Sequence, residues 1–388
     1  MGDEVIEKTD IPMSITDVKR AWMEIDLNAL DENYAQLQKL LPENCEIMAI
    51  VKADAYGHGA ERIAKKLREE GVNSFAVATV VEGVKLRESG LDGEILILNY
   101  TPPQYARLLH DNNLTQLLID SFYARALDET GYKIHVHIAI DTGMHREGFD
   151  SNDILEIEKV YGYANLIVDG VSSHLSVSDS LDDDDTKYTE SQIKKYYTII
   201  ESLRNSGYDT GKLHIQASYG MLNYPNLKCD YVRVGITLFG VMSHDEQTRV
   251  QLELKPVLSL KSIIAQVRWI EAGESVSYGR LYTAERALKL ATVCIGYADG
   301  IPRHLSGNGG HCIVQGVKVP IVGRICMDLL MVDVTAVDAA APGDVVTLIG
   351  VDRDERISCE EVALAAGTIS NELLCRLGSR LTRQYIVH

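Results

Sequence analysis

Short, almost wholly apolar runs rich in β-branched residues alternate with amphipathic stretches between residues 45 and 240. Continuous apolar runs of this kind are typical of strands buried on both faces, as in a parallel sheet. Eight runs fit this description, at residues 46–52, 74–80, 94–99, 116–120, 134–141, 166–174, 212–218 and 231–240. The stretches between them, such as 61–70 and 190–205, have a helical pattern. Eight strand–helix units predict an α/β fold of the (β/α)8 TIM-barrel type, with a doubly wound sheet as the alternative.

The pattern changes after Lys255-Pro256. Five strand-like runs follow, separated by turns rich in glycine, at residues 258–270, 288–295, 311–322, 330–334 and 345–349. Only residues 359–366 have a clear helical pattern, which indicates a mainly β domain. We therefore predict a barrel domain over residues 21–255 and a C-terminal β domain over 256–388. Residues 1–20 are predicted to be a polar tail or a linker stub.

Composition and charge exclude several classes of protein. Hydrophobic residues make up 46% and charged residues 24%, which is ordinary for a globular chain. The net charge of −18 disfavours binding to nucleic acid or to an anionic membrane. Seven scattered cysteines without a CxxC pair argue against disulfides and zinc and favour a reducing compartment. We expect a cytoplasmic chain without a metal site, and a solvated loop at the acidic run 182–185.

Polar side chains follow the predicted barrel strands, where active sites of such barrels lie. These residues are Lys52, Arg146, His174, Ser218 and Arg233. A lysine at the end of a buried strand is costly unless it is paired or chemically used. A desolvated lysine becomes a nucleophile that forms Schiff bases. Position alone favours a lysine that simply reaches solvent at the barrel rim, so the surrounding motif has to decide.

Residues 51–59 read VKADAYGHG and resemble the pyridoxal-phosphate signature of the alanine racemase family. Further motifs similar to that family stand at residues 22–27, 141–144, 232–236, 276–279, 296–300 and 323–328. The resemblance runs from residue 21 to the end of the chain. It implies a (β/α)8 barrel followed by a β domain, and pyridoxal 5'-phosphate held by Lys52. It also implies a head-to-tail homodimer in which each active site borrows residues from the partner's C-terminal domain.

Racemisation needs a proton-transfer group on each face of the substrate, and the resemblance assigns these roles to Lys52 and to Tyr278 of the partner subunit. A phenol of ordinary pKa ~10 is a poor base at neutral pH and needs cationic neighbours. His174 and Arg233 match the histidine and arginine that serve this purpose in the family. Arg233 would also face the pyridine nitrogen and leave it unprotonated, because arginine does not readily release a proton. The alternative for His174 is a satisfied core histidine.

The other matched residues would bind the cofactor phosphate or the substrate. Those implied at the phosphate are Tyr56, Ser218 and the backbone N–H groups of Gly235 and Ile236. The substrate carboxylate would meet Arg146 and the backbone N–H of Met327 of the partner subunit. Tyr297, Arg303 and Arg324 resemble the residues of the family's entry channel, although surface ion pairs explain the two arginines equally well.

Three positions depart from the family pattern. Ala139 stands where the family often has a lysine that supports the arginine matched by Arg146, and His145 replaces a glycine. Asn371 replaces a tyrosine, which removes a ring and offers a donor and an acceptor to a side chain larger than methyl. This combination resembles the serine/alanine racemases of vancomycin resistance (the VanT type), whose cytoplasmic racemase domain follows a transmembrane part.

We therefore predict an amino-acid racemase (an isomerase) that interconverts L- and D-serine, and alanine, for modified peptidoglycan precursors. Residues 1–20 would then be a linker behind an upstream membrane domain. A housekeeping alanine racemase is the alternative within the family. A barrel-type amino-acid decarboxylase and a non-catalytic pyridoxal-phosphate-binding protein are the alternatives outside it.

Overall fold

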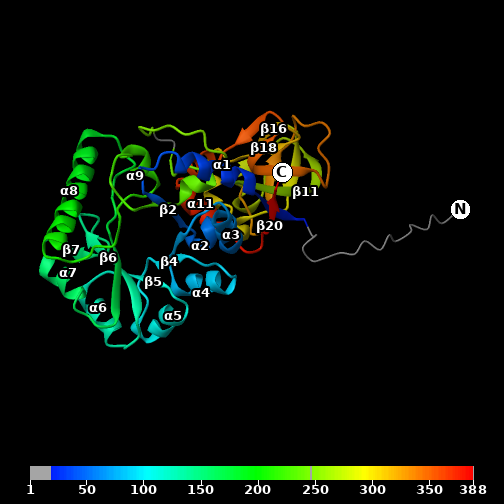
Figure 1. The fold of residues 1–388 in the computed structure, drawn as a ribbon. Helices are drawn as coiled ribbons and strands as arrows, with labels where there is room; N and C mark the ends of the chain where they lie inside the picture. The colour runs from blue at the N-terminus through cyan, green and yellow to red at the C-terminus, as the bar shows by residue number, and fades with distance from the viewer. Residues whose placement is uncertain (1–18, 245–246, 388) are drawn as a thin grey trace. The chain divides into compact units, whose positions relative to one another are not determined.

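The computed structural model describes residues 19–244 and 247–387 (Figure 1). Most of the predicted tail at residues 1–20 therefore lies outside the described residues. The chain divides into a barrel unit and a β unit. The barrel unit comprises Ile25–Leu258, Thr368–Arg376 and the described residues from Tyr385 onward. The β unit comprises Ser259–Gly367, Leu377–Gln384 and the described residues before Ile25.

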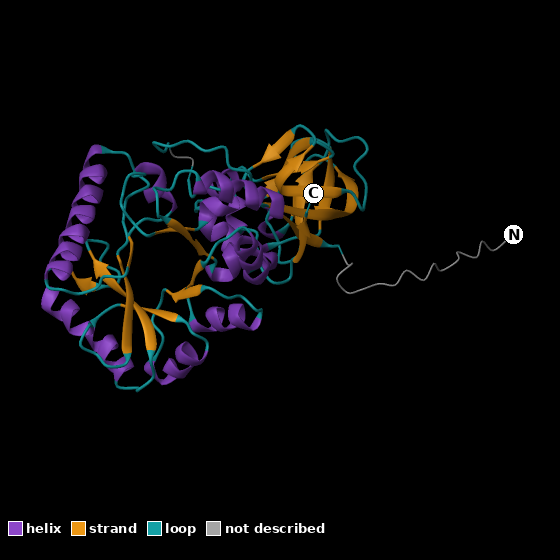
Figure 2. Cartoon of the chain, in the orientation of Figure 1, coloured by secondary structure: helices purple, strands orange, loops and turns teal. Residues whose placement is uncertain are grey.

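Eight parallel strands form the barrel (Figure 2). They are β2 (Glu46–Ile50), β3 (Ser74–Val77), β4 (Glu94–Ile97), β5 (Thr115–Leu118), β6 (Ile134–Asp141), β8 (Leu166–Ser172), β9 (Lys212–His214) and β10 (Tyr231–Val234). The sheet runs in the order β10-β2-β3-β4-β5-β6-β8-β9, with the short β7 (Phe149–Asp150) beside β6. A parallel bridge between Ala217 and Arg233 links the two ends of this order. The predicted (β/α)8 barrel is confirmed, and the doubly wound alternative is wrong.

Helices connect the strands, and Figures 1 and 2 show α4 to α8 on the outer side of the barrel. The α-helices of this unit before residue 258 are α1 (Leu27–Gln38), α2 (Lys52–Tyr56), α3 (Ala60–Glu69), α4 (Val80–Glu88), α5 (Ala106–Asp111), α6 (Ser121–Asp128), α7 (Ile154–Val160), α8 (Asp183–Asn205) and α9 (Ser218–Asn223). Two 3-10 helices, η2 (Pro103–Tyr105) and η3 (Ile236–Phe239), complete the unit's connections. Helix α3 shows why the elements pack as they do: Ile63, Ala64 and Leu67 form its buried stripe, and its remaining face is charged.

The expectation of a solvated loop at residues 182–185 is wrong. Asp182 is the residue before α8, and the three following aspartates form the first turn of that helix. Carboxylates are favourable there because the N-terminus of a helix carries partial positive charge. The acidic run therefore starts a helix of 23 residues.

The β unit is built around a sheet with the order β16-β15-β18-β11-β1-β20, to which β14, β17 and β19 are added. Its strands are β1 (Ala21–Asp26), β11 (Leu258–Ile270), β14 (Leu288–Val293), β15 (His311–Val314), β16 (Val317–Pro320), β17 (Leu330–Asp333), β18 (Val345–Asp352), β19 (Glu355–Ile357) and β20 (Thr382–Ile386), with the separate hairpin β12 (Ser275–Val276) and β13 (Tyr282–Thr283). Helix α10 (Cys359–Ala366) begins with a capping box between Ser358 and Glu361. Short 3-10 helices stand at η4 (Tyr278–Arg280), η5 (Tyr297–Asp299) and η6 (Arg303–Leu305).

The sequence pattern predicts one boundary between the two domains, after residue 255. The two structural units differ from that prediction in two places. Strand β1 pairs within the sheet of the β unit, although it precedes the barrel in sequence. Helix α11 (Ser370–Arg376) belongs to the barrel unit, where it packs against α2 and buries Leu373 and Leu374. No helix among the residues in the described ranges has the length and hydropathy needed to cross a membrane.

Candidate active site

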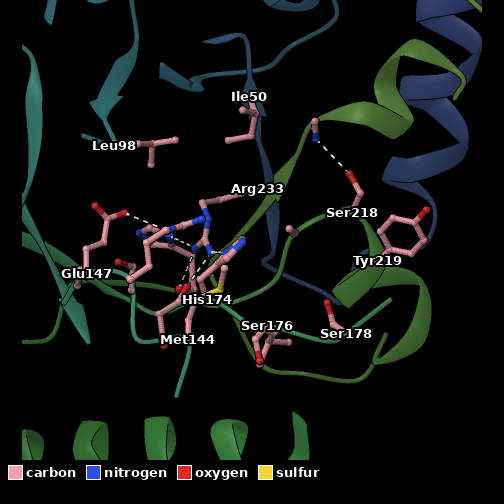
Figure 3. Close-up of a pocket in the computed structure, with 18 of the residues that line it drawn as sticks. Ile50, Leu98, Met144, Glu147, His174, Ser176, Ser178, Ser218, Tyr219 and Arg233 are labelled. Carbon is pink, nitrogen blue, oxygen red and sulfur yellow. Dashed lines mark hydrogen bonds and ion pairs between the residues drawn. The ribbon is translucent and has the colours of Figure 1, made fainter. Parts of the chain in front are cut away.

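A cavity of about 470 Å³ opens at the carboxyl ends of the barrel strands (Figure 3). Nine of the residues singled out in the sequence line it: Lys52, Tyr56, Arg146, His174, Ser218, Arg233, Gly235, Ile236 and Asn371. These residues are far apart in the sequence, from Lys52 to Asn371. They meet because parallel strands direct their carboxyl ends to one side of a barrel.

Lys52 is held by an unusual turn of backbone. The four residues after it, Ala53 to Tyr56, all have φ between 52° and 55°, the left-handed region. This conformation costs about 1–2 kcal/mol per residue other than glycine. It persists because side chains hold it: the backbone N–H of Ala53 donates to Glu82 Oε1 at 2.7 Å, and Asp54 Oδ1 accepts from the backbone N–H of Ala60 at 2.8 Å.

Glu82 is therefore expected to stabilise the lysine turn. Its carboxylate also accepts from the backbone N–H groups of Ala78 and Thr79, at 2.9 and 3.0 Å. Glu82→Ala should lower the free energy of unfolding by about 1–3 kcal/mol, because these donors lose their acceptor. Urea unfolding measures this, with Glu88→Ala, an exposed acid at the end of the same helix, as the control. Equal stability of the two variants would contradict the role of Glu82.

The surroundings of Lys52 favour its neutral form. Burial lowers the pKa of its amine most, and the positive charges of Arg146 and Arg233 lower it further, while Cys375 and Glu82 oppose the shift. A neutral amine is the form that attacks a carbonyl carbon. Lys52 is therefore electrostatically suited to carry an aldehyde cofactor.

Arg233 is 7% exposed and lies in the wall of the cavity, next to His174 (Figure 3). Its Nη2 donates to the backbone oxygen of Ser173 at 2.7 Å and lies 3.0 Å from His174 Nδ1. Burial, followed by the nearby Arg233 charge, lowers the pKa of His174 to about 3, and burial lowers that of Arg233 to about 10. At neutral pH the pair thus carries one positive charge, on Arg233, and His174 is neutral rather than cationic.

Neutral hydrogen-bonding groups suited to an anion gather at Ser218. This residue begins α9, and its Oγ accepts from the backbone N–H of Gly235 at 3.2 Å (Figure 3). Ile236 begins η3, and the first N–H groups of such segments have no partner within the helix. A Cβ at Gly235 would lie 2.7 Å from the hydroxyl of Tyr56, so a larger residue there would have to displace the tyrosine ring. Burial raises the pKa of Tyr56, which keeps it a neutral donor. These residues fit the phosphate of pyridoxal phosphate.

The departures around Arg146 have a local structural explanation. His145 has φ 53°, a conformation that favours glycine, and its ring Nδ1 lies 3.0 Å from Asp141 Oδ2, within hydrogen-bond distance. Asp141 also accepts from the backbone N–H groups of Gly143 and His145. Arg146 itself is half-exposed, and its Nε lies 3.8 Å from a carboxylate oxygen of Glu147. Position 139, where the family often has a lysine that supports this arginine, is an alanine here. Glu147 is the acid that lies within ion-pair distance of Arg146.

The remaining predicted residues, Tyr278, Tyr297 and Met327, lie in the β unit, with exposed fractions of 70%, 42% and 52%. The backbone N–H groups of Tyr297 and Ala298 donate to the carbonyl oxygens of Cys326 and Met327, both at 3.0 Å. These bonds bring the segments at 297 and 327 together. The hydroxyl of Ser277, next to Tyr278, donates to the carbonyl of residue 324 at 2.6 Å. All three residues therefore belong to the β unit, while the cavity is lined by residues of the barrel unit.

Three residues at the site carry little signal in the sequence. Glu82 and Glu147 look like ordinary surface acids, because their partners are backbone groups or an arginine that only the fold places nearby. His214, which contacts Arg233 Nη1 at 2.6 Å, ends strand β9. Its place in a predicted barrel strand is the one signal that would have indicated it.

Family models match both parts of the chain. Residues 25–243 match the alanine racemase N-terminal domain, and residues 257–385 match the alanine racemase C-terminal domain. The chain belongs to the alanine racemase family. Enzymes of this family depend on pyridoxal phosphate, which agrees with the fit of the cavity residues to that cofactor.

The relatives in this family are named for different substrates. The chain is 42% identical over 366 residues to an amino-acid racemase of Enterococcus faecalis and 38% identical over 368 residues to a serine/alanine racemase of Enterococcus gallinarum. These matches cover 94% and 95% of this chain and 51% and 52% of the relatives, so the chain spans about half their length. The solved structure of an alanine racemase from Clostridium difficile 630 has a TM-score of 0.87 and 34% identity, with 95% of this chain and 96% of that chain covered.

Proposed function

We propose that this chain is the catalytic part of a pyridoxal-phosphate-dependent racemase that interconverts the L and D forms of serine and alanine. The observation that carries the proposal is the cavity itself. Lys52, whose pKa is lowered, lines it together with the Ser218–Gly235 anion site and the buried Arg233. Membership of the alanine racemase family supports the reaction class.

The residues of the chain divide the work of racemisation. When bound, pyridoxal phosphate supplies the electron sink that acidifies the Cα–H of an amino acid. The amine of Lys52 would take or return the Cα proton on one face of the substrate, and the phenol of Tyr278 of the partner subunit would do so on the other. Arg146 would bind the substrate carboxylate, for which its forked donors are suited. The Met327 N–H of the partner subunit would assist it.

Arg233 would limit side reactions. A guanidinium has only donors to offer and does not readily release a proton, so a ring nitrogen that it faces stays unprotonated. By keeping that nitrogen unprotonated, Arg233 would weaken the electron sink that the cofactor supplies and so disfavour side reactions. The effect matters most for serine, whose hydroxyl is a leaving group on the adjacent carbon.

Asn371 is the residue proposed to favour serine. It lines the cavity, and its buried Oδ1 has no hydrogen-bond partner among the described residues. A buried acceptor without a partner is costly, so a substrate hydroxyl that donates to it would gain affinity. A housekeeping alanine racemase, the alternative within the family, would have no use for this group.

The test compares kcat/KM for L-serine and L-alanine in the cofactor-loaded protein. Serine within about tenfold of alanine, or ~1.4 kcal/mol in transition-state free energy, would support the proposal. Asn371→Tyr should lower the serine-to-alanine ratio by about tenfold, because the ring fills the space and removes the amide. Asn371→Leu keeps a similar volume and should lower the ratio as well if the amide matters. An unchanged ratio in both variants would leave a housekeeping alanine racemase.

These D-amino acids are proposed to feed modified peptidoglycan precursors, the role from which vancomycin resistance would follow. The comparison of kcat/KM for serine and alanine also tests this proposal, because a peptidoglycan precursor that contains D-serine needs a source of D-serine. A strong preference for alanine would remove its basis. A decarboxylase would instead release carbon dioxide without exchange of the Cα proton, so exchange with solvent deuterium separates the two reactions.

A further inference from the structure

A second cavity, of about 450 Å³, lies at the other end of the barrel. Its charged and aromatic lining comes from residues at or near the beginnings of strands: Glu94, His135, His137, Asp169, Lys212 and Tyr231. Strand beginnings and strand ends lie on opposite sides of a parallel barrel. This cavity is therefore distinct from the one that contains Lys52.

A row of side chains crosses the barrel interior between the two cavities. Arg233 Nη1 lies 2.6 Å from His214 Nδ1, and His214 Nε2 lies 2.8 Å from His137 Nδ1. His137 Nε2 lies 3.2 Å from Glu94 Oε1. Both histidines are completely buried. The row thus joins a residue of the candidate active site to a carboxylate at the far end of the barrel.

The hydrogen bonds in this row have only one consistent direction. A guanidinium can only donate, so His214 Nδ1 accepts from Arg233. A neutral imidazole carries one proton, so His214 Nε2 donates and His137 Nδ1 accepts. His137 then carries its proton on Nε2, which is directed at Glu94. Burial, followed by the charge of Arg233, lowers the pKa of His137 to about 3, and the same causes lower that of His214, so both stay neutral at physiological pH.

The contact between His137 and Glu94 is close but not aligned as a hydrogen bond. It meets the distance of an ion pair, and both His137 Nε2 and Glu94 Oε1 are buried without another hydrogen-bond partner among the described residues. The hydroxyl of Tyr231, which lines the same cavity, also interacts with the Glu94 carboxyl group. The second oxygen of Glu94 accepts from the hydroxyl of Ser74 at 3.2 Å, which holds the carboxylate in place.

Arg233 needs a negative charge that its immediate surroundings do not supply. Its hydrogen-bond partners are backbone carbonyls and the two neutral histidines, and no ion pair within the described ranges includes it. A buried charge without compensation is costly. Glu94 is the acid at the end of the row, which His137 approaches at ion-pair distance. Burial raises the pKa of the Glu94 carboxyl, and hydrogen bonds from Tyr231 and Ser74 oppose that rise.

We propose that Glu94 is a positioning residue that compensates the charge of the buried Arg233 guanidinium, and holds its orientation, through His137 and His214. The effect on catalysis rests on the proposed function, in which Arg233 acts on the cofactor ring. The direction of the hydrogen bonds does not rest on it, because that follows from the side chains alone.

The first test is nitrogen NMR of the holoenzyme labelled with 15N in its histidine rings. Both His137 and His214 should be neutral and protonated on Nε2, with Nδ1 as the acceptor. A proton on Nδ1 of either ring, or a charged ring, would overturn the relay. This measurement needs no substitution and no activity, so it separates failure of the relay from failure of the proposed racemase function.

The second test uses Glu94→Gln, which keeps an acceptor and the shape of the side chain but removes the charge. We expect kcat for racemisation to fall about tenfold with KM unchanged, and Glu94→Asp to recover part of the loss. Asp169→Asn is the matched control, because Asp169 lines the same cavity but pairs with His135 at 2.5 Å and lies outside the row. Equal kcat values for Glu94→Gln and Asp169→Asn would show that Glu94 does not act on Arg233.

Discussion

Replacing Lys52 with alanine should abolish racemisation, with a loss of at least about a thousandfold in kcat. The substitution removes the amine that is proposed both to hold the cofactor and to serve as one of the two proton-transfer groups. The visible absorbance of the bound cofactor should disappear with the activity. Both quantities are measured on protein reconstituted with pyridoxal phosphate and freed of excess cofactor.

Lys65→Ala is the matched control for that experiment, because Lys65 is an exposed lysine on α3, close in sequence to Lys52. It should keep both the absorbance and the activity. A Lys52→Ala protein that still shows the bound-cofactor band would mean that another amine carries the cofactor. If the wild-type protein showed the cofactor absorbance but no racemase activity, the result would favour a decarboxylase or a non-catalytic protein that binds the same cofactor.

Replacing Tyr278 with phenylalanine should also remove racemisation, by about a thousandfold or more, because one face of the substrate would lose its proposed proton-transfer group. Exchange of the Cα proton with solvent should persist for one enantiomer, since Lys52 still serves the other face. Tyr282→Phe, a half-buried tyrosine on β13, is the control and should leave racemisation intact. Full racemisation by Tyr278→Phe would exclude this tyrosine as the second base.

Mixing the two inactive proteins tests whether active sites are shared between subunits. In a mixed dimer, one site would combine the intact Lys52 of one chain with the intact Tyr278 of the other. Random exchange of subunits should therefore restore about a quarter of the wild-type activity, because half of the dimers are mixed and one of their two sites is complete. No recovery in a mixture shown to exchange subunits would mean that each site is built from one chain.

Much of the barrel follows from local sequence. A strand buried on both faces has to be apolar along its length, so runs such as 134–141 are visible without knowledge of their neighbours. The observed β6 has the same bounds as that run. Run 231–240 extends beyond β10, because the short helix η3 that follows is equally apolar. Run 212–218 extends beyond β9 through residues 215–217, which form no regular element, to the first residue of α9. Hydrophobicity indicates burial there but does not distinguish a strand from a helix.

The division into units depends on contacts that no local pattern contains. Helix α11 follows the β domain in sequence, yet its buried leucines pack with the barrel unit and bring Asn371 to the cavity. In the same way, β1 precedes the barrel but pairs in the sheet of the β unit. Which surface a short amphipathic element covers is decided by the shape of the surfaces available, not by the element itself.

By itself, the sequence determined the barrel, the β domain and the residues matched to the cofactor motif, because strand burial and a contiguous motif are properties of neighbouring residues. Only the tertiary structure decided that Glu82 supports the left-handed turn after Lys52, that His174 is neutral beside Arg233, and that a row of buried side chains links Arg233 to Glu94. These last properties depend on distance and desolvation between residues far apart in the chain, and a one-dimensional pattern does not record either quantity.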